Sequence, residues 1–151
     1  MKFIEKYKNE GILGLSMRQP YAEMMLHGKV ETREWNTDYR GWVLICAAKT
    51  EYTYPEVKQM SGKYAQHIED IMRGRNVVLG QAIAIGRLID TKELVKDGGD
   101  YPRTFVDVNA NEKKLYGFFF EDVVRIKPFA VTGKLSLFAL NAEIVEQIEF
   151  L

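Results

Sequence analysis

The sequence LSMRQPYAEMMLHGKVETREWNTDYRGWVLICAAK, residues 15–49, carries the most information about this chain. It combines charged side chains with two Trp and two Tyr over a short distance. Charged residues interleaved with apolar ones in this way predict that some of the charges face a cavity. The segment ends in Trp42–Ala48, a continuous apolar run that is typical of a strand buried on both faces.

Within this segment, Val30–Trp35 alternates in the manner of a β-strand. The alternation places Glu31 and Arg33 on one face and Thr32 on the other. Arg33 offers a planar fork of donors that suits a phosphate or a base edge, and Glu31 is able to accept from an exocyclic amine or to hold the arginine in place. We interpret these two residues as a recognition pair. The simpler alternative is an intramolecular ion pair at the edge of a sheet.

Other side chains near this pair are candidates for contact with a nucleotide. Aromatic rings beside an arginine stack on unpaired bases, although a Trp also packs commonly in a core or at its rim. A helix that begins at Gln19-Pro20 offers free backbone N–H groups to a phosphate, unless that end is simply solvated. The candidate binding residues are Arg18, Gln19, Tyr21, Lys29, Glu31, Arg33, Trp35, Tyr39, Arg40, Lys134 and Ser136.

Length and composition limit the class of protein. The chain of 151 residues fits one domain, residues 1–151. Hydrophobic residues make up 46% and charged residues 28%, which is typical of a folded globular protein. The 21 basic and 21 acidic residues cancel, which argues against a protein that coats nucleic acid through bulk positive charge. No apolar segment reaches secretory or membrane-spanning length, so we expect a cytoplasmic protein without a membrane partner.

The sequence predicts neither a metal nor another cofactor. The single cysteine, Cys46, lies in the apolar run and is interpreted as a small buried hydrophobe. His27 and His67 are far apart, and no Cys or carboxylate spacing near them is typical of zinc. The chain also lacks a phosphate-binding loop of the GxxxxGK type.

Periodicity and turn residues predict the remaining elements. Many short strands with two or three helices favour the α+β class and a small curved sheet or barrel. In the first half of the chain we expect a short helix or frayed arm at 1–9 within an N-terminal extension at 1–11, a strand at 12–16, a helix from Pro20 that stops at Gly28, and a helix at 55–73 kinked or split at Ser61-Gly62. A bent strand region at 77–89 with Gly80 and Gly86, a helical turn at 91–95 and an exposed excursion at 96–114 are expected to follow. The chain is then expected to form strands at 116–120 and 134–140, separated by a loop at Lys127-Pro128, and a final helix at 142–150.

The order LSMRQPYAEMML, a Gly-Lys element, VETREW, TDYRGWVLICAAK and a late IKPFAVTGKLSLFAL resembles the ASCH domain, named for homology to activating signal cointegrator. The resemblance covers residues 12–49 and continues more loosely at 77–90 and 116–140. It implies a PUA-like twisted β-barrel with flanking helices and a cleft beside the Gly-Lys and Glu-x-Arg strand. Binding of RNA is the usual proposed role of the family, and a few branches are hydrolases, including an acetylcytidine amidohydrolase and a ribonuclease.

The sequence departs from the family pattern in one respect. The family motif is Gly-x-Lys-x-x-Glu-x-Arg, whereas Gly28, Lys29, Glu31 and Arg33 stand closer together here. The amidohydrolase branch uses a Lys, a Thr at the position of Glu31 and a separate Glu, and this sequence does not reproduce that set.

Three functional classes follow. The first is binding of single-stranded RNA or of a modified nucleotide or nucleoside through a polar cleft beside the Gly-Lys and Glu-x-Arg strand. The second is a metal-independent hydrolase acting on RNA or an acylated nucleoside, with Lys29 or Glu31 as candidates for acid–base work. The third is a protein-interaction module that uses the excursion at 96–114.

Overall fold

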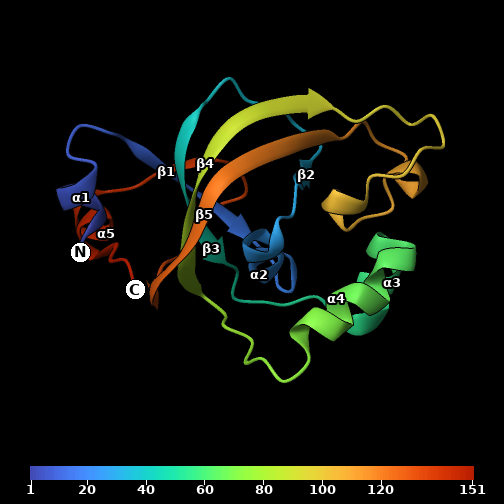
Figure 1. The fold of residues 1–151 in the computed structure, drawn as a ribbon, viewed down its shortest axis with the longest axis horizontal. Coiled ribbons are helices and arrows are strands. Elements are labelled where there is room, and N and C mark those ends of the chain that lie inside the picture. Colours follow the sequence, from blue (N-terminus) through green and yellow to red (C-terminus); the bar gives the residue numbers. More distant parts are fainter.

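The apolar run after Gly41 forms the central strand of the protein. The computed structural model describes residues 1–151, and six strands form one mixed sheet in the order β2-β5-β4-β3-β1-β6 (Figure 1). Only β1 and β3 run parallel, and the other pairs are antiparallel. The strands are β1 (Ile12–Met17), β2 (Glu31–Arg33), β3 (Gly41–Ala47), β4 (Gln81–Glu93), β5 (Tyr116–Ala130) and β6 (Phe138–Ala139).

The long pair β4 and β5 gives the sheet its curvature. Their register shifts at three places, one of which contains Gly86. A Cβ atom on Gly86 would lie 2.9 Å from Cγ2 of Val123, so the close approach of the two strands requires glycine there. Because bulges bend a strand and increase its twist, the sheet curls into a half-barrel (Figure 1). The α+β fold with a curved, barrel-like sheet and flanking helices is confirmed.

Helices cover two sides of this half-barrel. The first and last helices lie together beside the chain ends, whereas α3 and α4 lie on the far side, near the segment that links β4 to β5 (Figure 1). Short 3-10 helices occupy Met25–His27, Gly62–Tyr64, Pro102–Thr104 and Val108–Ala110. The α-helices are α1 (Phe3–Lys6), α2 (Tyr21–Met24), α3 (Tyr54–Ser61), α4 (Ala65–Met72) and α5 (Ala142–Gln147).

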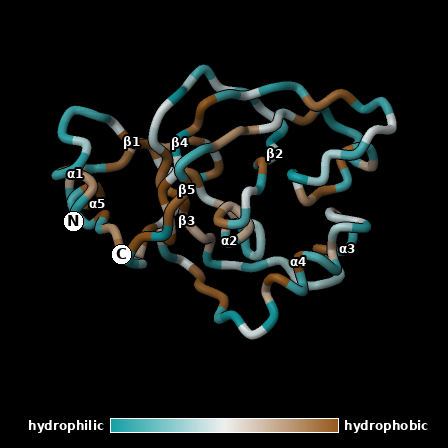
Figure 2. The backbone as a smooth tube through the Cα atoms, in the orientation of Figure 1, coloured by the Kyte–Doolittle hydropathy of each residue, from teal (hydrophilic) through white to brown (hydrophobic).

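The core lies on both faces of β3. Trp42 and Leu44 belong to one buried cluster, with residues of α1 and the C-terminal segment. Val43 and Ile45 belong to a second cluster, with residues of β1 and the helix after it. This alternation is the two-residue period of a strand, and it confirms that β3 is buried on both faces. Figure 2 shows the apolar residues gathered along the central strands.

Two predicted boundaries in the helices are confirmed. Gly28 adopts a left-handed conformation with φ +83° directly after the 3-10 helix that extends α2. The long helical region divides at Ser61 and Gly62 into α3 and α4. A capping box that was not predicted starts α3, in which Thr53 and Glu56 satisfy each other's backbone N–H groups. Pro20 lies one residue before α2, and not at its first helical position as predicted.

Three predictions in the second half of the chain are wrong. Residues 91–93 extend β4 and pair with β5, so there is no helical turn at 91–95. Lys127-Pro128 lies within β5, at a register shift against β4. No residue of β4 is paired with Pro128, so the N–H that proline lacks is not needed for the sheet. In the region 134–140 only Phe138–Ala139 is a strand, so Lys134 and Ser136 lie in the loop before it.

The excursion at 96–114 is exposed only in part. Residues 96–100 are exposed, but Thr104 and Val108 are buried. The segment is held by backbone hydrogen bonds, since the Val30 N–H donates to the Arg103 carbonyl at 2.7 Å. The excursion therefore packs against the protein between β2 and α3. The predicted final helix at 142–150 is shorter, because α5 ends at residue 147.

No helix in the structure has both the length and the apolar character needed to cross a membrane.

Candidate functional site

A cavity of about 1100 Å³ lies between one end of the half-barrel and the layer formed by α3 and the excursion. The ends of β1 and β3 and the strand β2 supply one part of its lining. Gln59 and Met60 of α3 and several residues between 106 and 115 supply the opposite part. The loop at 133–135 completes the wall.

Two local features place Lys29 at this cavity. The left-handed turn at Gly28 ends the helical segment, and the Lys29 N–H donates back to the Met24 carbonyl at 3.2 Å. The helix itself is fixed to the sheet by Glu23, whose two carboxylate oxygens accept from Arg125 on β5 at 3.1 and 2.7 Å. Lys29 therefore lines the cavity from a fixed backbone position.

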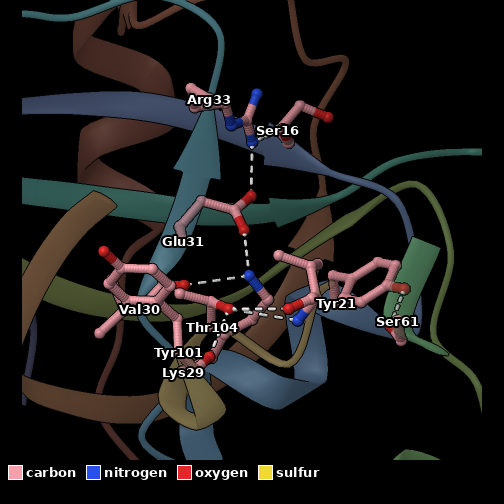
Figure 3. Close-up of polar contacts among 10 residues, drawn as sticks. Ser16, Tyr21, Lys29, Val30, Glu31, Arg33, Ser61, Tyr101 and Thr104 are labelled. Atoms are coloured by element: carbon pink, nitrogen blue, oxygen red, sulfur yellow. Dashed lines mark hydrogen bonds and ion pairs between the residues drawn. The ribbon is translucent and has the colours of Figure 1, made fainter. Parts of the chain in front are cut away.

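Lys29, Glu31 and Arg33 form a connected ion network at the wall of the cavity (Figure 3). The Lys29 Nζ donates to Oε1 of Glu31 at 2.7 Å and to the Val30 carbonyl at 3.2 Å. The Arg33 Nη2 donates to Oε2 of Glu31 at 2.9 Å. The Lys29 side chain is 1% exposed, that of Glu31 8% and that of Arg33 17%. The predicted shared face of Glu31 and Arg33 is thus confirmed, and Arg33 is the member most open to a guest.

The two cations keep the carboxylate ionised. Burial alone would raise the pKa of Glu31, but the charges and hydrogen bonds of Lys29 and Arg33 outweigh it and hold the pKa at about 2. Burial lowers the pKa of the Lys29 ammonium, and the Glu31 carboxylate opposes this effect. With all three groups charged, the network carries one excess positive charge, and both carboxylate oxygens are occupied.

Arg33 also joins two strands that are not neighbours in the sheet. Its Nη2 donates to the backbone carbonyl of Ser16 on β1 at 2.9 Å. Its Nε is buried without a partner, and its Nη1 makes no hydrogen bond within the chain. The Arg33 Cζ lies 5.9 Å from the ring centroid of Trp35, which packs edge-on against Phe118. Of the three guanidinium nitrogens of Arg33, only Nη2 is therefore hydrogen-bonded within the chain.

Tyr21 forms a second buried part of the lining. Its hydroxyl shares a hydrogen bond of 2.5 Å with Oγ of Ser61, and burial raises the pKa of Tyr21 to about 12. The Lys29 Nζ lies 5.5 Å from the centroid of the Tyr21 ring (Figure 3). Tyr21 thus holds α2 against α3 beneath the ion network.

Arg18 lies on Tyr52 at the mouth of the cavity. The Arg18 Cζ is 3.9 Å from the centroid of the Tyr52 ring, and two of its nitrogens donate to the carbonyls of Thr50 and Glu51. Lys134 and Trp35 also line the cavity. Of the predicted residues, the structure brings together Arg18, Tyr21, Lys29, Glu31, Arg33, Trp35 and Lys134.

Four predicted residues do not line this cavity. Gln19 is buried, and both ends of its side-chain amide bond to backbone groups. The Tyr39 hydroxyl donates to the carbonyl of Trp42, and Arg40 donates to two carbonyls in its own turn. Ser136 donates to the carbonyl of the next residue. These contacts give each of the four a role in local structure.

Tyr52, Met60 and the wall at 106–115 line the cavity without having been predicted from the sequence. The two tyrosines that flank Thr53, a few residues after the buried strand, are a pattern that points to Tyr52. Nothing in the local sequence indicates the other two, because tertiary packing brings them to the cavity. No group of three or more His, Cys, Asp or Glu side chains in the structure is arranged to hold a metal ion.

Comparison with known proteins identifies the fold. No protein-family model and no curated protein matches the sequence. Among solved structures, the chain is similar to ASCH from Zymomonas mobilis, with a TM-score of 0.61 and 16% sequence identity over 93% of this chain and 97% of that one. An identity this low shows a shared fold only. The chain therefore has the fold of an ASCH protein, as its sequence resemblance predicted.

Proposed function

We infer that the protein binds single-stranded RNA or a modified nucleotide in the cavity beside Lys29, Glu31 and Arg33. The observation that carries this proposal is the state of Arg33, whose guanidinium is fixed by Glu31 and Ser16 while its Nη1 remains without a partner at the cavity. A guanidinium held in this way needs little ordering when a guest binds, which favours affinity. Its planar donors suit a phosphate or the acceptor edge of a base.

The charges around the cavity favour an anionic or acceptor-rich guest. With Lys29 protonated, the ion network has a net positive charge, and Arg18 and Lys134 add further cations to the lining. Both carboxylate oxygens of Glu31 already accept from Lys29 and Arg33, so these cations compete with an exocyclic amine for the carboxylate. This supports the second of its two predicted roles, which is to hold Arg33 in place.

The aromatic residues supply surfaces on which a base can stack. Trp35 lies beside Arg33, and Tyr52 lies under the guanidinium of Arg18. Stacking of a base on such a surface contributes about 1–3 kcal/mol and tolerates different bases. The cavity volume of about 1100 Å³ leaves room for such a guest, since ligand pockets commonly measure about 300–1,000 Å³.

The hydrolase alternative depends on Lys29. A carboxylate with a pKa of about 2 is a weak base at neutral pH, so Glu31 is a poor candidate for proton transfer. Lys29 is buried at the cavity wall and its pKa is lowered, which is the direction that an amine base requires. If the protein hydrolyses RNA or acylated cytidine, Lys29→Gln abolishes turnover. Unchanged turnover in that variant removes Lys29 from the mechanism.

The third class, a protein-interaction module, receives less support. The middle of the excursion is buried at Thr104 and Val108, and the excursion lines the cavity with residues such as Val106 and Asp107. This segment is therefore engaged in part by the protein itself, and its exposed residues, which include 96–100 and 112–114, remain for a partner.

Measured affinity for a fluorescent single-stranded RNA tests the proposal. Arg33→Ala is expected to weaken binding by about tenfold or more, because a hydrogen bond to a charged group contributes about 1.5–3 kcal/mol. Lys58→Ala is the control, since this exposed lysine of α3 lies outside the cavity lining. Trp35→Leu leaves the ion network in place and is expected to weaken binding as well. Equal affinities in all three variants, or no binding by the unmodified protein, would overturn the proposal.

A further inference from the structure

Three cationic side chains at the cavity have no carboxylate partner. Arg18, Lys49 and Lys134 line it, and none has a carboxylate oxygen within 4 Å. Lys49 and Lys134 are exposed, and Arg18 is half-buried. In a protein whose total charge is zero, three unpaired cations at one cavity form a local positive patch. We call these three residues the cationic rim.

The sheet topology explains why the three lie together. Arg18 directly follows the last residue of β1, and Lys49 comes two residues after the end of β3. These ends are joined, because the Ala48 N–H donates to the Met17 carbonyl at 2.9 Å. The parallel pairing of β1 and β3 therefore delivers two of the cations to the same end of the sheet.

The loop after β5 brings the third cation to this end. The Gly80 N–H donates to the Ala48 carbonyl and the Val131 N–H donates to the Gly80 carbonyl, both at 3.2 Å. Further along the loop, Gly133 packs so tightly on Ser16 that an added Cβ would lie 2.5 Å from the serine Cβ. Lys134 follows this contact directly, so it lies at the end of β1 close to Arg18.

The carboxylates of the lining lie elsewhere and are engaged. Glu34, beyond β2, pairs with Lys113 of the excursion at 3.4 Å. Asp107 accepts from the Ala110 N–H within the excursion. The cavity is thus divided between a cationic side at the strand ends and a side that carries the Glu34–Lys113 pair and the carboxylate of Asp107.

We propose that the cationic rim holds the phosphodiester backbone of a single strand, so that the cavity takes two or more nucleotides and not an isolated nucleoside. The inference rests on the proposed function and specifies its guest. A nucleoside has no phosphate and would leave all three cations unused. The cavity volume of about 1100 Å³ lies at the upper end of the range of about 300–1,000 Å³ that is usual for a small ligand. Trp35 beside Arg33 and the Arg18–Tyr52 stack provide two separate surfaces for successive bases.

A length series of guests tests this inference. Affinities of the full chain are measured for uridine, the dinucleotide UpU and the tetranucleotide of the same base, at several salt concentrations. The tetranucleotide is expected to bind at least tenfold more tightly than the nucleoside. Its log affinity is expected to fall with log salt by about 0.7 for each phosphate that is neutralised.

Variants assign the effect to the rim. Lys49→Gln combined with Lys134→Gln is expected to weaken tetranucleotide binding about tenfold at low salt and to reduce the salt slope by about 1.4. Uridine binding is expected to stay unchanged. Lys58→Gln, which removes the same charge outside the cavity, is the control. Both rim lysines are exposed, so the fold tolerates their loss.

Other outcomes separate the two proposals. If uridine binds as tightly as the tetranucleotide, and its binding depends on Arg33, the inference about the rim is overturned and the proposed function stands. A double variant with unchanged affinity and salt slope also overturns the inference about the rim alone. If no guest binds to the unmodified protein, both proposals are overturned.

Discussion

The Arg33 guanidinium on β2 donates to the backbone carbonyl of Ser16 on β1 at 2.9 Å. These strands lie four places apart in the sheet order, so the bond crosses the open side of the half-barrel. Hydrogen bonds between neighbouring strands do not close this side, and one side chain spans it. Arg33 therefore takes part in holding the fold as well as in the candidate site.

Arg33→Ala is expected to lower the free energy of unfolding by about 3 kcal/mol, because it removes two charge-assisted hydrogen bonds at a partly buried ion network. Urea unfolding followed by circular dichroism measures the change. Arg73→Ala is the control, since its ion pair with Asp70 is solvent-exposed and its loss should cost less than about 1 kcal/mol. Equal losses in the two variants would show that Arg33 does not support the half-barrel.

The Glu31 carboxylate is expected to make stability fall in acid. Its pKa is depressed from 4.5 to about 2 in the folded protein, so the unfolded chain takes up the proton first. The stabilisation is present above pH 4.5 and is lost as the pH falls toward 2, with a size on the order of 3 kcal/mol. Unfolding free energies measured from pH 6 to pH 2 give the slope.

The Glu31→Gln variant shows which carboxylate is responsible for that slope. This variant is less stable at neutral pH, because Lys29 and Arg33 lose their shared partner. Its stability should nevertheless change less between pH 4.5 and pH 2 than that of the unmodified protein. Parallel pH profiles for the two proteins would assign the acid sensitivity to another group.

The hydrogen bond between Tyr21 and Ser61 is expected to stabilise the contact of α2 with α3. Tyr21→Phe and Ser61→Ala should each cost about 1–2 kcal/mol, because each leaves a buried hydroxyl without its partner. The double variant should cost less than the sum of the two single changes. Thermal unfolding of the four proteins provides this cycle, and additive losses would show that the bond contributes nothing.

The thiol of Cys46 is expected to be unreactive in the folded protein. Burial raises its pKa to about 12, and the side chain is fully inaccessible. A colourimetric thiol reagent at pH 8 should react only after urea unfolds the chain. Rapid reaction in buffer alone would mean that β3 opens readily.

The sequence predicted those parts of the site that depend on local periodicity. The two-residue alternation placed Glu31 and Arg33 on one face, and the glycine at position 28 marked the turn that delivers Lys29. Contacts between distant segments could not be predicted in this way. Met60 and the wall at 106–115 reach the cavity only through tertiary contacts, such as the bond that the Arg103 carbonyl accepts from Val30.

The errors of the sequence analysis have the same cause. A proline normally interrupts a strand, but Pro128 lies at a register shift against β4, where no hydrogen bond from its backbone nitrogen is needed. Gln19 was predicted to contact a ligand, yet its amide bonds to the carbonyl of Val78, which lies far along the chain. A residue at the exposed start of a helix and a buried residue that bonds to a distant backbone group look alike in sequence. The partner that distinguishes them lies far along the chain.

The backbone bond between Val30 and Arg103 has a mechanical consequence. It ties the residue just before β2 to the excursion, so the two sides of the cavity are joined at this point. We expect this tether to keep the separation of the two walls nearly constant when a guest enters.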